Sequence, residues 1–156
     1  MFTHIDHINI VVSCLNEAKA FFQECGFALE DEADLEGDWI SAIVGLAGVR
    51  ARYAKLSLSG SRTKLELMEY ASPPSQRDPD MSKANQLGYR HIAFEVADIV
   101  SVVDKLTSRG IEMLSEIQTY EATGKKLVYF YGPDKILLEL AEYPKCDPSA
   151  MKKDNS

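Results

Sequence analysis

The feature that most constrains this chain is a pair of short sequence phrases that occurs twice in the same order. His-Ile-x-x-x-Val begins at His7 and again at His91. Leu-Glu-Leu-x-Glu-Tyr begins at Leu65 and again at Leu138. Internal similarity of this kind predicts a tandem repeat, in which two half-domains share one fold and place corresponding side chains in corresponding positions.

The order of elements predicted from the hydrophobic pattern repeats as well. In each half an alternating strand is followed by a helix, and the helices end at Gly26 and Gly110, where glycine suits the left-handed position after a helix. Three more strands follow in each half, so the chain predicts the α+β order strand, helix, strand, strand, strand, twice. The predicted strands are 8–12, 27–31, 49–59 and 63–70, then 89–96, 111–117, 125–131 and 136–143.

Several local interpretations accompany this order. Ser13 or Asn16 can cap the first helix, and Asp98 can cap the second. Residues 32–38 are predicted to form an acidic turn after the second strand. Trp39–Leu46 has helical spacing, which fits either a lid over a site or a short helix that plugs an edge of the core.

The boundaries of the halves follow from composition. Residues 71–86 contain three prolines and several polar residues, which is typical of a linker. We therefore expect a single domain over residues 1–143, with one module over 1–70 and the other over 87–143. Residues 144–156 are polar and predict a frayed tail.

Composition argues against several classes of function. Acidic residues outnumber basic ones, 24 against 17, and the net charge of −7 does not suit a nucleic-acid-binding surface. No apolar run approaches the roughly 18 residues of a membrane span, and residues 1–6 carry no basic start of a signal peptide. Cys14, Cys25 and Cys146 are widely spaced and odd in number, so we expect buried free thiols and a cytoplasmic protein.

Strand alternation places the repeated histidines and glutamates on equivalent faces. The apolar neighbours of His7, Glu66, His91 and Glu139 pack against the helices, so these four side chains point to the opposite faces. Two neutral imidazoles and two carboxylates balance a divalent cation. Mixed nitrogen and oxygen ligands suit Zn, Ni, Co, Mn or Fe(II) better than Ca or Mg. A lone histidine on a strand is more often a core residue, but two histidines and two glutamates at repeat-related positions favour one metal site with room for substrate.

Other charged residues near these strands have weaker interpretations. Glu69 and Glu142 have the opposite parity, and we expect them to be solvated or paired at the rim of the sheet. Four cations at strand ends could meet a phosphate or carboxylate of a substrate, although such residues are usually solvated: Arg50, Arg52, Lys125 and Lys126.

With its histidines and glutamates in this order, the chain resembles the vicinal oxygen chelate superfamily. This group contains glyoxalase I, methylmalonyl-CoA epimerase, extradiol dioxygenases and bleomycin-resistance proteins. The resemblance spans about residues 5–143 and is most specific over 88–94 and 132–140, where the usual Asp-Pro-Asp-Gly turn is altered to Gly-Pro-Asp-Lys. It implies two βαβββ modules that form a cupped mixed sheet around one divalent metal ion.

The lyase and epimerase members are the most similar, because they carry a carboxylate or amide at the position of Glu66. The resemblance implies abstraction of a proton next to a carbonyl, with Glu139 as the base, Glu66 as its partner and the metal as a Lewis acid. The alternatives are an Fe(II)-dependent dioxygenase that uses His7, His91 and Glu139, and a protein that sequesters a small molecule. We expect a homodimer, and a glutathione adduct, an acyl-CoA or a cyclic ketone as substrate.

Overall fold

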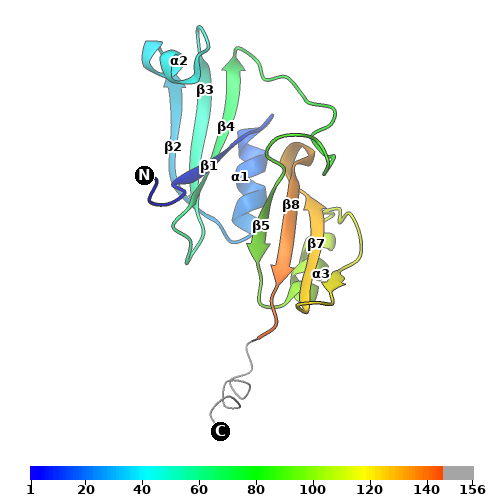
Figure 1. Ribbon diagram of the computed structural model, residues 1–156. Coiled ribbons are helices and arrows are strands. Elements are labelled where there is room, and N and C mark those ends of the chain that lie inside the picture. The colour runs from blue at the N-terminus through cyan, green and yellow to red at the C-terminus, as the bar shows by residue number, and fades with distance from the viewer. Residues whose placement is uncertain (146–156) are drawn as a thin grey trace. The chain divides into compact units, whose positions relative to one another are not determined.

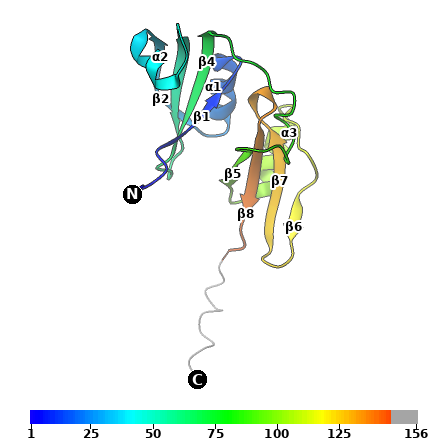
Figure 2. The same ribbon diagram turned by 45° about the horizontal axis from the view of Figure 1, so that its top comes forward.

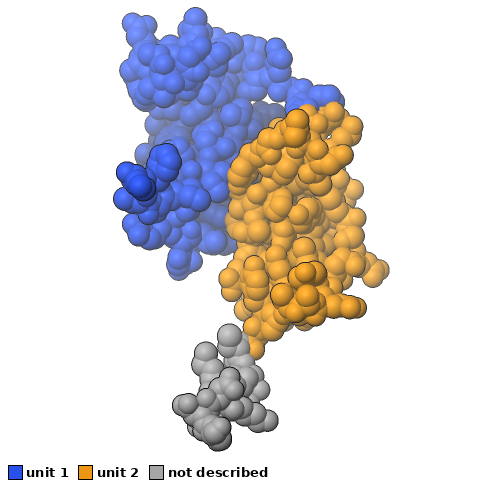
Figure 3. Space-filling model, viewed as in Figure 1, with its two compact units in different colours: residues 1–79 blue, residues 80–156 orange. Residues whose placement is uncertain are grey.

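The computed structural model of the protein describes residues 1–145, so most of the predicted tail, together with Cys146, lies outside the described residues. The chain divides into two compact units, residues 1–79 and 80–156 (Figure 3). Each unit contains one four-stranded mixed sheet (Figure 1). The predicted α+β class and the tandem order of strand, helix and three strands are confirmed. The grouping of both modules into one domain stays a prediction.

The first unit has the strand order β1-β4-β3-β2. Its outer strand β1 runs parallel to β4, whereas β3 runs antiparallel to both of its neighbours. The elements are β1 (His7–Val11), α1 (Leu15–Glu24), β2 (Ala28–Glu36), α2 (Asp38–Val44), β3 (Arg50–Ser57) and β4 (Lys64–Ser72).

The second unit repeats this topology with the strand order β5-β8-β7-β6. Here β5 runs parallel to β8, and β7 is antiparallel to β8 and β6. The elements are β5 (His91–Glu95), α3 (Ile99–Thr107), β6 (Gln118–Tyr120), β7 (Lys125–Tyr131), a 3-10 turn η1 (Pro133–Lys135) and β8 (Leu137–Glu142).

Each sheet buries one face against its helix, as the alternation predicts. In the first unit Phe22 of α1 is fully buried, together with Leu65 and Leu67 of β4. In the second unit Ile99 of α3 and Leu138 of β8 are buried in the same way. Each such side chain stabilises the fold by about 1.5–3 kcal/mol. The opposite face of each sheet therefore presents the residues that alternate with this core.

The second glutamate of each repeated phrase holds the start of a helix. The N–H of Leu15 in α1 donates to Glu69 Oε2 at 2.6 Å, and the N–H of Ile99 in α3 donates to Glu142 Oε2 at 2.7 Å. These carboxylates satisfy helix N–H groups that have no partner within the helix and complement the positive end of the helix dipole. The expectation that they are merely solvated or paired at the rim was therefore incomplete.

The predicted caps have mixed outcomes. Asp98 is the N-cap of α3 and accepts the N–H of Ser101 at 3.1 Å, as predicted. The prediction for α1 was wrong: Cys14 occupies the N-cap without a side-chain hydrogen bond, and the strand residue Glu69 supplies the acceptor instead. A carboxylate that arrives from a distant strand has no local sequence signal.

Two other local predictions were wrong. Residues 32–36 are not a turn but continue β2 to Glu36, because each finds a partner along β3. Charged residues on a sheet edge are common, because they discourage pairing with other chains. Residues 111–117 form a single bridge, Met113 to Phe130, and the regular edge strand is β6, farther along the chain.

Helix α2 covers part of the face opposite α1. Its residue Ile40 is buried in a cluster with Val49, Ala51 and Met68, and Met68 has the same strand parity as Glu66. Figure 2 shows α1 and α2 on opposite sides of the first sheet. The helix therefore acts as a plug over one end of this face. Among the described residues, no helix is long and apolar enough to span a membrane.

Candidate metal centre

The strand registers place a histidine and a glutamate side by side in each unit. Residue Asn9 lies opposite Glu66 between β1 and β4, and Ala93 lies opposite Glu139 between β5 and β8. In both units the histidine lies two residues before the residue opposite the glutamate, on the same face of the sheet. The repeat in sequence is thus also a repeat in side-chain geometry.

In the first unit, His7 Nε2 lies 3.4 Å from Glu66 Oε2. On the other side of the ring, His7 Nδ1 lies 2.9 Å from Asp6 Oδ2, and this hydrogen bond holds the pKa of Asp6 below its usual range. An ionised carboxylate only accepts hydrogen bonds, so Nδ1 carries the proton and donates it. In the neutral ring, Nε2 then presents its lone pair toward Glu66, which is the tautomer that a metal ligand needs.

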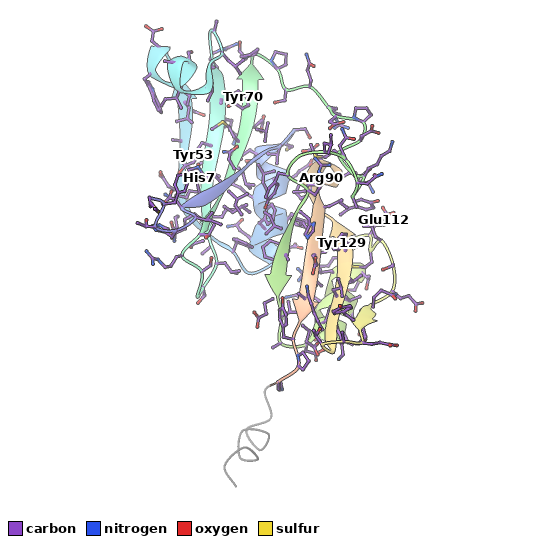
Figure 4. All side chains as sticks on the ribbon, viewed as in Figure 1. His7, Tyr53, Tyr70, Arg90, Glu112 and Tyr129 are labelled. Atoms are coloured by element: carbon purple, nitrogen blue, oxygen red, sulfur yellow. The ribbon has the colours of Figure 1, made fainter. Side chains whose placement is uncertain are left out.

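A tyrosine on the neighbouring strand supports this glutamate. The hydroxyl of Tyr53, on β3, donates to Glu66 Oε1 at 3.4 Å. Burial, followed by the charge of Glu66, raises the pKa of Tyr53 to about 12. The phenol therefore stays protonated and remains a donor at neutral pH. Figure 4 labels His7 on β1 and Tyr53 on β3.

In the second unit, His91 Nε2 lies 3.1 Å from Glu139 Oε2. Glu139 is only 4% exposed, the one charged residue among the buried side chains of the described chain. Tyr129, labelled in Figure 4, lies opposite Glu139 in register, with its hydroxyl 3.5 Å from His91 Nε2. Burial, followed by the charge of Glu139, raises the pKa of this tyrosine.

A lysine completes the second cluster. Lys125, at the start of β7, donates from Nζ to Glu139 Oε1 at 2.9 Å. This hydrogen bond is the main reason why the pKa of Lys125 is raised. The two oxygens of Glu139 are thus divided, since Oε1 meets the ammonium and Oε2 faces His91.

The donor chemistry of both clusters fits a divalent cation. In each unit an imidazole nitrogen and a carboxylate oxygen, both acceptors when the ring is neutral, face each other across 3.1–3.4 Å. Such a pair needs a shared proton or a cation between its atoms. Within either unit, the described residues form no group of three or more potential ligands, so each half offers two. The complete set of His7, Glu66, His91 and Glu139 takes two residues from each unit and stays a prediction.

Two of the other cations singled out in the sequence are engaged elsewhere. Arg52 lies 3.8 Å from Glu69, and Lys126 lies 3.0 Å from Glu142, in both cases as a cross-strand pair on the helix face. These two residues therefore support the helix-capping carboxylates rather than the histidine face.

Sequence reasoning missed three residues that contact the histidine–glutamate pairs: Asp6, Tyr53 and Tyr129. Asp6 directly precedes His7, so an outer partner for the imidazole could have been sought there. The tyrosines could not have been assigned without the strand register, because alternation gives a face but no neighbour.

Comparison with known families supplies the context for these clusters. The family description "Glyoxalase/Bleomycin resistance protein/Dioxygenase superfamily" matches residues 4–140. The chain belongs to this superfamily. The match includes all four predicted ligands, and the resemblance inferred from the sequence is confirmed.

The chain is similar to three further proteins of different kinds. A glyoxalase family protein from Bacillus cereus is 33% identical, with a TM-score of 0.86 over 93% of this chain and 97% of that one. A 2-epi-5-epi-valiolone epimerase from Actinomyces sp is 32% identical over 148 residues, 90% of this chain and 79% of the relative. The fosfomycin resistance protein FosX from Listeria monocytogenes, in complex with Mn(II) and sulfate, shares the fold at 20% identity, with a TM-score of 0.61 over 92% of this chain and 95% of that one.

Proposed function

We propose that the protein is a metal-dependent epimerase or lyase that removes a proton from the carbon next to a carbonyl group. The observation that carries this proposal is the repeated pair of an imidazole and a carboxylate, with Nε2 3.4 Å from Oε2 in one unit and 3.1 Å in the other. Four such ligands balance one divalent ion and leave coordination positions for a substrate oxygen.

The relatives support this class of reaction. The valiolone epimerase, at 32% identity over most of this chain, is named for an inversion of configuration. Inversion next to a ketone proceeds by removal and return of a proton, which requires a base and stabilisation of the negative charge on oxygen. The Mn(II) in FosX is an example of a divalent ion held within this fold.

In the proposed reaction, His7, Glu66, His91 and Glu139 hold the metal, which when bound supplies Lewis-acid stabilisation of the developing oxyanion. Glu139 is the proposed base, because it is a buried carboxylate whose Oε2 lies 3.1 Å from Nε2 of the proposed ligand His91. Glu66 acts as its partner in the return of the proton. Asp6 accepts the Nδ1–H of His7 and so orients the ring with Nε2 toward Glu66.

The first experiment is elemental analysis of the protein purified without a histidine tag, beside its His91→Ala variant. We expect about one Zn, Ni, Co, Mn or Fe per predicted site in the wild type and loss of the metal in the variant. Absence of metal after reconstitution with each of these ions would refute the metal-dependent reaction. It would favour the alternative of a protein that sequesters a small molecule.

The second experiment measures exchange of a substrate proton with D₂O by NMR. The candidate substrates are 2-epi-5-epi-valiolone, methylmalonyl-CoA and the glutathione adduct of methylglyoxal. We expect deuterium to enter next to the carbonyl of one of them, and the Glu139→Gln variant to lose at least about 100-fold of the rate, since a positioned base contributes 10²–10⁴. Full turnover by this variant would refute the role of Glu139.

Activity that requires both Fe(II) and O₂ would favour a dioxygenase instead. The homodimer and the cytoplasmic location stay predictions.

A further inference from the structure

The two histidine–glutamate pairs differ in the side chain that donates a hydrogen bond to Oε1 of the glutamate. In the first unit a neutral phenol, Tyr53, reaches Glu66 Oε1 at 3.4 Å. In the second unit an ammonium, Lys125, donates to Glu139 Oε1 at 2.9 Å. The pairs are therefore similar in shape but unequal in charge.

Lys55 is the residue that could give Glu66 an ammonium partner like that of Glu139, because it lies opposite Glu66 in the register of β3 and β4. Among the described residues, however, Glu66 forms an ion pair with His7 alone, and Lys55 appears in none. The position that faces Glu139 in the second unit holds Tyr129 rather than a lysine, and the cation comes from four residues earlier on the same face.

The geometry of Lys125 suits a fixed charge rather than a mobile surface cation. Its side chain is 24% exposed, and its Nζ lies 5.5 Å from the centre of the Tyr143 ring. Its partner Glu139 is buried, so water screens this ion pair less than a surface pair. The ammonium binds Oε1 and leaves Oε2 free beside His91.

We propose that Lys125 is a positioning residue that restricts Glu139 to one metal-binding oxygen and weakens the affinity of the second half-site for a cation. This inference rests on the proposed metal site. With Oε1 engaged by Lys125, only Oε2 faces the imidazole, and a bidentate carboxylate would have to break the ion pair. A positive charge on the same carboxylate also repels an arriving divalent ion.

Lys126 provides a matched control on the next residue of the same strand. It carries the same charge, but it lies on the opposite face of the sheet and pairs with Glu142 at 3.0 Å. A general effect of net charge on metal affinity would appear equally in variants of both lysines. An effect that acts through Glu139 would appear only at Lys125.

The experiment is a titration of the metal-free full-length chain with Mn(II), in which free Mn(II) is measured by electron paramagnetic resonance. The variants are Lys125→Met, Lys125→Gln, Lys125→Arg and Lys126→Met, and circular dichroism verifies that each is folded. A neighbouring charge changes the proton affinity of a carboxylate by about 10- to 1,000-fold. For this partly exposed lysine we expect the low end, an affinity about tenfold higher in both neutral variants.

The Lys125→Arg variant, which keeps the charge, and the control Lys126→Met should bind Mn(II) as tightly as the wild type does. Equal affinity in wild type and both neutral variants, or weaker binding in those variants, would overturn the role of Lys125 while leaving the metal site intact. The same gain in Lys126→Met would overturn it too, because net charge would then explain the effect. A wild type that binds no metal would overturn the proposed function and this inference together.

Discussion

Replacement of Glu69 by alanine tests whether a strand carboxylate holds the first helix. The N–H of Leu15 donates to Glu69 Oε2 at 2.6 Å, and Leu15 is fully buried. Hydrogen bonds to charged groups contribute about 1.5–3 kcal/mol, and a buried donor left without a partner costs a similar amount. Because the Glu69 side chain is 30% exposed, water can partly replace it. We expect the variant to lower the free energy of unfolding by about 2 kcal/mol.

An Arg52→Ala variant distinguishes the contribution of the helix cap to stability from that of the Arg52–Glu69 ion pair. Its guanidinium lies 3.8 Å from Glu69 and is 41% exposed, so removal of this surface pair is expected to cost less than about 1 kcal/mol. The Glu69→Gln variant retains an oxygen that can accept the Leu15 N–H but has no charge. Its loss of stability should therefore lie between those of Glu69→Ala and Arg52→Ala.

Urea denaturation followed by tryptophan fluorescence is a suitable assay, because the single tryptophan of the chain, Trp39, lies in α2 of the first unit. The free energy of unfolding comes from linear extrapolation to zero urea. Equal losses in Glu69→Ala and Arg52→Ala, or a loss below about 0.5 kcal/mol in the former, would refute the capping role.

Two further predictions concern the second helix and the first histidine. The pKa of Glu142 is lowered by the Ile99 N–H and then by Lys126, so its contribution to stability is present above the ordinary carboxyl pKa of 4.5 and is lost as pH falls through the lowered value. Melting temperatures measured against pH should thus fall more steeply in acid for wild type than for Glu142→Gln, and parallel curves would contradict this role. The Asp6→Ala variant should bind Mn(II) about tenfold more weakly than the wild type. Loss of an outer partner of a metal-bound histidine typically lowers metal affinity about 10- to 100-fold, and we expect the low end of this range because Asp6 is 76% exposed. Unchanged affinity in the same titration would exclude a role of Asp6 at His7.

Much of the candidate site follows from alternation along the strands. The positions of His7 and Glu66 relative to their apolar neighbours determined which face each side chain occupies, and the structure places them 3.4 Å apart. The same reasoning holds for His91 and Glu139, at 3.1 Å. Their joint role as metal ligands stays a prediction, because it combines residues of both units.

The sequence by itself determined the repeat, the order of elements and the face of each strand residue, because these depend on periodicities of two and of about three and a half residues. Only the tertiary structure decided which side chains meet. The pairing of β3 with β4 brings Tyr53, two residues from the position opposite Glu66, to that carboxylate, and β7 brings Lys125 to Glu139, whereas alternation alone gives neither partner. The cap of α1 likewise comes from Glu69, 54 residues farther along the chain, and contacts over such separations leave no local pattern in a sequence.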